Sequence, residues 1–213
     1  MDFIEKYNCV GILGGTFNPI HIGHIELAKN AIKQYGDIEQ IIIMPNNLPA
    51  YKENKDIADI SHRRKMIEIA IKNAQDISIS MMEVERGGIT FTSDTLEDIK
   101  RKNPSMKIYF IIGADSLFSI TKWHNYKDVL RLCTLLVARR SSDYNNMEEY
   151  ALELVKNIGY GDIKFIYMDE INISSSGIRK DISEGRMPFL MLPEGLDLYI
   201  KKNKLYGCMD YES

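Results

Sequence analysis

Short apolar runs alternate along the chain with segments whose apolar residues recur at helical spacing. The runs predict six buried strands, at residues 9–13, 40–44, 77–81, 107–112, 134–138 and 164–168. The helical spacing predicts amphipathic helices, at residues 22–35, 61–73 and 92–102, the second of them capped by Ser61. Because strands and helices alternate, we expect an α/β fold with a doubly wound parallel sheet.

One eleven-residue string joins the first predicted strand to the first predicted helix. Residues 14–24 read GGTFNPIHIGH. Glycines let the backbone approach a ligand closely, and a helix start offers N–H groups that suit a phosphate. His21 and His24 are three residues apart, so both imidazoles share one face of the first turn and could grip phosphate oxygens. For the two histidines alone, a tight βα turn with surface side chains is an equal alternative.

Two later segments could complete an anion site. Gly113-Ala114-Asp115 follows the 107–112 strand, and with strand order 3-2-1-4-5 this turn lies beside the glycine turn, at the crevice where ligands bind. Asp115 could bond ribose hydroxyls or a hydrated cation, or it could cap a helix. Ser174, Ser175 and Ser176 open a late helix that carries Arg179 one turn in. An ordinary capped helix with a surface arginine is the alternative there.

Composition limits the classes of function. Hydrophobic residues make up 45% of the 213 residues and charged residues 27%, which fits one globular domain with residues 171–213 as a helical C-terminal subdomain. The net charge of −3 gives no basic field for nucleic acid or anionic lipid, and no apolar run is long enough to cross a membrane. Three widely spaced cysteines without a CxxC pattern indicate reduced thiols of a cytoplasmic protein.

The string resembles the GGTFDPxHxGH signature of the nucleotidyltransferases that transfer an adenylyl group from ATP, with Asn18 in place of the usual Asp. Within that superfamily, the order of the motifs from about Val10 to Tyr206 is similar to that of the bacterial nicotinate-mononucleotide adenylyltransferases. The resemblance implies that His21, His24, Lys52 and Arg179 act on the ATP phosphates. It also implies an ATP cradle of Gly14, Gly15, Thr16, Phe17, Gly113, Asp115, Ser175 and Ser176.

The loop after the second strand matches the family in part. The family has a Pro-Pro-His-Lys stretch here, whose lysine contacts phosphate; Lys52 matches it, but Ala50 and Tyr51 replace Pro and His. Asn46, in the same loop, is expected to bind nicotinate mononucleotide. From local sequence alone, Lys52 is an ordinary solvated lysine.

Two segments match the family's pocket for nicotinate. Thr92 corresponds to the threonine of a Tyr-Thr-Phe-Asp-Thr segment that receives the carboxylate, although Phe91 and Ser93 depart from it. Trp123 corresponds to a tryptophan that lies against the pyridine ring. The alternatives are a helix cap for the first segment and a core residue for Trp123.

The resemblance implies that ATP and nicotinate mononucleotide react to give nicotinate adenine dinucleotide and pyrophosphate, a step of NAD biosynthesis. We expect Mg²⁺ to accompany ATP, held mainly by phosphates and water rather than by a dedicated set of protein ligands. Two rivals are another member of the superfamily, such as a phosphopantetheine adenylyltransferase or a cytidylyltransferase, and a nucleotide sensor without turnover. The sequence leaves the oligomeric state open, a homo-oligomer included.

Overall fold

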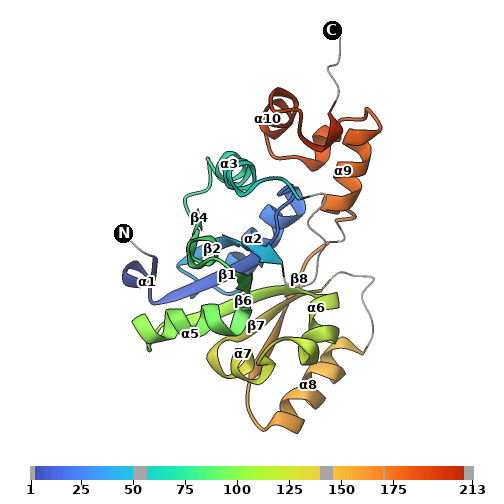
Figure 1. The fold of residues 1–213 in the computed structure, drawn as a ribbon. Helices are drawn as coiled ribbons and strands as arrows, with labels where there is room; N and C mark the ends of the chain where they lie inside the picture. The colour runs from blue at the N-terminus through green and yellow to red at the C-terminus, as the bar shows by residue number, and fades with distance from the viewer. Residues whose placement is uncertain (1–2, 50–56, 140–145, 170, 209–213) are drawn as a thin grey trace.

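The computed structural model describes residues 3–49, 57–139, 146–169 and 171–208. Its centre is a parallel sheet in the order β4-β2-β1-β6-β7-β8 (Figure 1). The strands are β1 (Cys9–Gly15), β2 (Gln40–Pro45), β4 (Ile77–Ile79), β6 (Lys107–Gly113), β7 (Thr134–Arg139) and β8 (Asp162–Tyr167). Each of the six predicted strands is present within a few residues of its expected bounds, and the α/β fold class is confirmed.

Helices cover both faces of the sheet, because the buried strands are apolar on both faces. Ile41 and Ile43 face one layer and Ile42 and Met44 face the other, and all four are fully buried. The first layer holds α2 (Ile22–Gln34), α3 (Ile60–Ala70), α9 (Ser175–Ser183) and α10 (Leu196–Lys202). The second holds α1 (Phe3–Lys6), α5 (Thr92–Lys102), α6 (Ala114–Ser119), α7 (Tyr126–Leu132) and α8 (Met147–Ile158).

The strand order places one crevice at the centre of the sheet. The chain runs outward from β1 through β2 to β4, and then returns to place β6 on the other side of β1. Leu13 of β1 is in register with Ile111 of β6, so the turns after these two strands are neighbours, as the predicted order requires. Ligands of such sheets bind at this reversal, beyond the carboxyl ends of the strands.

Some elements of the structure are not predicted by the sequence pattern. Strand β3 (Leu48–Pro49) pairs with β5 (Ile89–Thr90), and two-residue strands are too short to show a period. The helix α4 (Met82–Arg86) and the 3₁₀ turns η2 (Ile120–Lys122), η3 (Phe189–Met191) and η4 (Leu205–Gly207) were not predicted either.

One predicted helix cap is wrong. Asp59, rather than Ser61, caps α3, because its carboxylate accepts a hydrogen bond from the Ser61 backbone N–H at 2.8 Å.

The C-terminal helices extend the first layer, at the top of Figure 1. Ile178 and Ile182 of α9 and Leu196 and Ile200 of α10 are buried in the same apolar cluster as α2 and α3. Residues 140–145 and 209–213 lie outside the described residues. Within the described part of the chain, none of the helices has the length and apolar character needed to cross a bilayer.

Candidate active site

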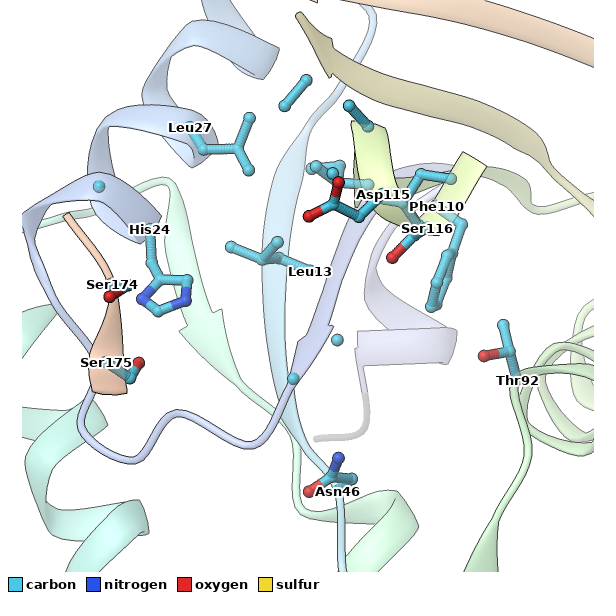
Figure 2. A pocket seen from close by; sticks show the side chains of 18 of the residues that line it. Leu13, His24, Leu27, Asn46, Thr92, Phe110, Asp115, Ser116, Ser174 and Ser175 are labelled. Carbon is cyan, nitrogen blue, oxygen red and sulfur yellow. The ribbon is translucent and has the colours of Figure 1, made fainter. Parts of the chain in front are cut away.

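A cavity of about 1150 Å³ lies at the carboxyl ends of β1 and β6 (Figure 2). Segments distant in sequence meet there: the turns after β1 and β6, the loop after β2, and the starts of α2, α5 and α9. Among the residues expected to bind substrate, those that line it are Gly14, Gly15, His21, His24, Asn46, Thr92, Gly113, Asp115, Trp123, Ser175, Ser176 and Arg179. Lys52 lies outside the described residues.

The two glycines that end β1 have little room for side chains. A Cβ at Gly14 would lie 3.3 Å from Phe110 Cζ, and one at Gly15 would lie 3.2 Å from Phe17 Cζ. Phe17 is 3% exposed and its ring meets the His24 ring edge-on, with centroids 5.1 Å apart. Phe17 therefore supports the turn from behind. Thr16 contributes through its hydroxyl, which accepts a hydrogen bond from Asn46 Nδ2 at 3.4 Å.

The two histidines form a stacked pair at the start of α2, with ring centroids 3.8 Å apart. His21 is the N-cap residue, and its backbone N–H donates to Nδ1 of His24 at 3.2 Å. This bond assigns the remaining proton of a neutral His24 to Nε2. Burial, together with the neighbouring His21, lowers the pKa of His24 well below its usual value. At pH 7 His24 is therefore a neutral hydrogen-bond donor.

The start of α9 packs directly against the turn after β1. Ser174 caps the helix by accepting a hydrogen bond from the Gly177 N–H at 3.1 Å. Ser175 Oγ donates to the Pro19 carbonyl at 2.9 Å, and Arg179 Nη1 donates to the Asn18 carbonyl at 2.8 Å. The N-terminal ends of α2 and α9 thus converge, and Figure 2 shows His24 on the same flank of the cavity as Ser174 and Ser175. The N-termini of two helices, together with a pair of histidines, favour the binding of a polyphosphate at this end of the cavity.

Aromatic residues and the start of α5 form the opposite end, where Figure 2 shows Thr92. Trp123 is half-buried and its ring meets Phe110 edge-on, with centroids 6.4 Å apart. Phe91 lies against His124 with ring centroids 4.3 Å apart. Residues 91 and 124 also line the cavity, and the sequence pattern did not single out His124 as a site residue. This end suits a flat ring bearing an anionic substituent.

Glu83 lines the cavity, although no sequence pattern identified it as a site residue. Its side chain is 5% exposed and its Oε1 accepts a hydrogen bond from Thr95 Oγ1 at 2.8 Å. Arg86 Nη2 donates to the same hydroxyl at 2.9 Å and Arg86 also pairs with Asp98. Burial raises the pKa of Glu83 to about 7, while the Thr95 bond and the Arg86 charge oppose that rise. The end of the cavity near Trp123 therefore carries less negative charge at pH 7 than a fully ionised Glu83 would give it.

Asp115 is an exposed carboxylate in the turn that follows β6. It lies in the first turn of α6, whose N-cap is Gly113, so the alternative that Asp115 caps the helix is wrong. The described residues contain no group of three or more His, Cys, Asp or Glu side chains that could hold a metal ion. A cation carried in by a nucleotide could meet Asp115 and keep most of its ligands from phosphate and water.

Comparisons with known proteins identify the family of this chain. The family model of cytidylyltransferase-like proteins matches residues 12–181. A probable nicotinate-nucleotide adenylyltransferase of Lachnoclostridium phytofermentans is 38% identical, and the alignment covers 92% of this chain and 98% of the relative. One of Lactococcus lactis is 32% identical, with 92% and 94% covered.

The fold also matches a solved structure. Nicotinic acid mononucleotide adenylyltransferase of Plasmodium falciparum, complexed with NaAD, superposes with a TM-score of 0.76 at 21% identity. That match covers 95% of this chain and 99% of the other. The family resemblance is thus confirmed over nearly the whole sequence, and the chain belongs to the cytidylyltransferase-like family and, within it, to the nicotinate-nucleotide adenylyltransferases.

Proposed function

We propose that this protein joins ATP and nicotinate mononucleotide to give nicotinate adenine dinucleotide and pyrophosphate. The observation that carries the proposal is one cavity with two different ends. Two helix starts and the His21–His24 pair form a polyphosphate end, and Trp123 with the start of α5 forms a ring-binding end. Relatives named as probable nicotinate-nucleotide adenylyltransferases align with 92% of this chain at 38% and 32% identity, which supports the proposal.

The reaction needs neither a protein nucleophile nor a general base. The 5′-phosphate of the mononucleotide is already anionic at pH 7, and its oxygen forms a bond to the α-phosphorus of ATP. The bond from that phosphorus to the bridging oxygen of the β-phosphate breaks, and pyrophosphate leaves with the electron pair. The protein therefore contributes alignment and stabilisation of charge.

The residues of the polyphosphate end contribute hydrogen-bond donors to the phosphates. His24 Nε2–H and His21 donate to phosphate oxygens, and the backbone of Gly14 and Gly15 lies around these oxygens. Arg179 has one nitrogen committed to the Asn18 carbonyl, which fixes the guanidinium and leaves its other donors for phosphate. We assign Lys52 to the same end on the family motif. Mg²⁺, when bound with ATP, supplies charge neutralisation on the phosphates, and Asp115 is the carboxylate placed to meet its water ligands.

The ring-binding end selects the acceptor. The start of α5 presents backbone donors to the nicotinate carboxylate, whereas an amide would turn an NH₂ donor toward them. A mismatch of roughly 1–3 kcal/mol predicts about a 5- to 150-fold preference in kcat/KM for nicotinate over nicotinamide mononucleotide. Trp123 stacks equally on both rings and does not contribute to this preference.

The decisive experiment measures pyrophosphate release and dinucleotide formation with ATP and Mg²⁺ against a panel of acceptors. Nicotinate mononucleotide, nicotinamide mononucleotide and phosphopantetheine are compared at equal concentration, and CTP replaces ATP in one arm. Turnover confined to another acceptor would support a different member of the superfamily. Nucleotide binding without turnover on any acceptor would support a sensor.

We further propose that residues 1–213 act as one domain with 171–213 as its helical C-terminal subdomain. Cys9, Cys133 and Cys208 are buried and none of them forms a disulfide, which fits the reducing cytoplasm that we propose as the working compartment.

A further inference from the structure

Arg63 is a buried cation beneath the active-site cavity. It lies on α3, is 2% exposed, and within the described residues makes no ion pair. Its donors go instead to four backbone carbonyls. Nη1 donates to Thr16 at 3.0 Å and to Asn46 at 2.9 Å, Nη2 donates to Asn47 at 3.3 Å, and Nε donates to Ala58 at 3.1 Å.

These carbonyls belong to both halves of the site. Thr16 continues the Gly14-Gly15 turn at the polyphosphate end, and Asn46 begins the loop after β2. Asn47 connects that loop to the ring-binding end, because its N–H donates to Thr90 Oγ1 at 3.4 Å and its Nδ2 donates to the Gly88 carbonyl at 3.2 Å. One guanidinium therefore joins the ATP turn to the loop that leads toward the acceptor, in addition to the direct bonds from Asn46 to the Gly15 carbonyl and the Thr16 hydroxyl.

The chemistry of the site explains why the residue is an arginine. A guanidinium is planar and has five N–H donors in a fixed fork, so it can reach carbonyls that lie in different directions. A lysine ammonium donates from a single nitrogen and cannot span them. Burial lowers the pKa of Arg63 from its ordinary value, yet an arginine starts high enough to stay charged, whereas a lysine at this depth would tend to lose its proton.

We propose that Arg63 is a positioning residue that sets the ATP-binding turn and the acceptor loop in a fixed relation, so that the acceptor phosphate meets the α-phosphorus in line. The inference rests on the proposed function, since it concerns the alignment of that reaction's two substrates. Each half of the site keeps its own contacts without Arg63. Loss of the link should therefore impair the reaction and the binding of a molecule that spans both halves more than the binding of either substrate alone.

The test compares Arg63→Lys and Arg63→Gln with wild type and with Arg64→Gln. Arg64 is the adjacent residue of α3, more than half exposed and paired with Glu68, so its variant controls for loss of charge on this helix. At a temperature where circular dichroism shows folded protein, we would measure kcat, KM for both substrates, and calorimetric Kd values. The ligands for calorimetry are a non-hydrolysable ATP analogue, nicotinate mononucleotide and the dinucleotide.

We expect kcat to fall by about 10²-fold in both Arg63 variants, with a weaker Kd for the dinucleotide and nearly unchanged Kd values for the separate substrates. Arg64→Gln should match wild type. Wild-type kcat in either folded Arg63 variant would overturn the inference, as would a lower unfolding temperature with unchanged kinetic constants. Failure of both variants to fold would also overturn it, because Arg63 would then be needed for the fold itself. A wild-type protein that makes no dinucleotide would instead refute the proposed function, and the inference with it.

Discussion

The glycine between the two histidines offers a test in which stability and activity should move in opposite directions. A Cβ at Gly23 would lie 3.1 Å from Nδ1 and 3.2 Å from Cε1 of the His21 ring. His21 is 7% exposed and stacked on His24, so it has little free space in which to retreat. In Gly23→Ala the imidazole must shift by a few tenths of an ångström, away from the position at which it would meet a phosphate.

The same substitution favours the helix. Gly23 lies in the first turn of α2 and does not have a positive φ, so alanine fits the backbone. Replacing a helical glycine by alanine stabilises a protein by up to about 1 kcal/mol. A displaced donor to a reacting oxygen should cost about 10- to 100-fold in kcat, somewhat less than complete removal of such a donor. We therefore expect an equal or higher unfolding temperature together with a strong loss of turnover.

Thermal unfolding followed by circular dichroism and pyrophosphate release would be measured on the same preparations. Gly36→Ala is the matched control, because a Cβ at Gly36 meets no atom within 4 Å and Gly36 follows the same helix. Unchanged kcat in a folded Gly23→Ala protein would refute the role of His21 geometry. A marked fall in unfolding temperature would refute the steric reasoning, since the strain would then have entered the helix rather than the imidazole.

Three further predictions concern single side chains. His24→Ala should lower kcat by about 10²–10³-fold with little change in circular dichroism, and near-normal turnover would remove His24 from the mechanism. Arg179→Lys should raise KM for ATP despite the retained charge, because a lysine cannot both bond the Asn18 carbonyl and present a planar fork to phosphate. Unchanged kinetics would place Arg179 outside the phosphate site. The raised pKa of Glu83 means that wild type loses up to about 3 kcal/mol of stability as pH rises from about 4.5 to about 7, since the folded state holds that proton more tightly. Urea unfolding of Glu83→Gln should lack this loss, and parallel pH profiles of the two proteins would contradict the raised pKa.

Local patterns in the sequence were sufficient for the sheet and the first half of the site. A buried strand is an apolar run of about five residues, so the run at 40–44 identified β2 without knowledge of its neighbours. The string at 14–24 contains both the glycines and the histidines of one strand-turn-helix unit. Spacing alone indicates that its two histidines lie close together, and in the structure the rings of His21, at the N-cap, and His24 have centroids 3.8 Å apart.

Elements with short or irregular signals could not be predicted in this way. The two-residue strands β3 and β5 are stabilised by pairing with each other across a sequence gap of about forty residues. The cap of α3 also depends on a loop conformation, since Asp59 and Ser61 are both good capping residues and only the backbone path selects Asp59.

The tertiary structure alone decided the roles of Arg63, Glu83 and Phe17. Nothing in the local sequence distinguishes Arg63 from other helix residues, and only the fold brings the carbonyls of Thr16, Asn46 and Asn47 to its guanidinium. Glu83 acquires its raised pKa from burial that no local sequence encodes. The physical reason is common to these residues: spacing along the chain fixes which side chains share an element, whereas hydrogen bonding, desolvation and close packing depend on segments that only folding brings together.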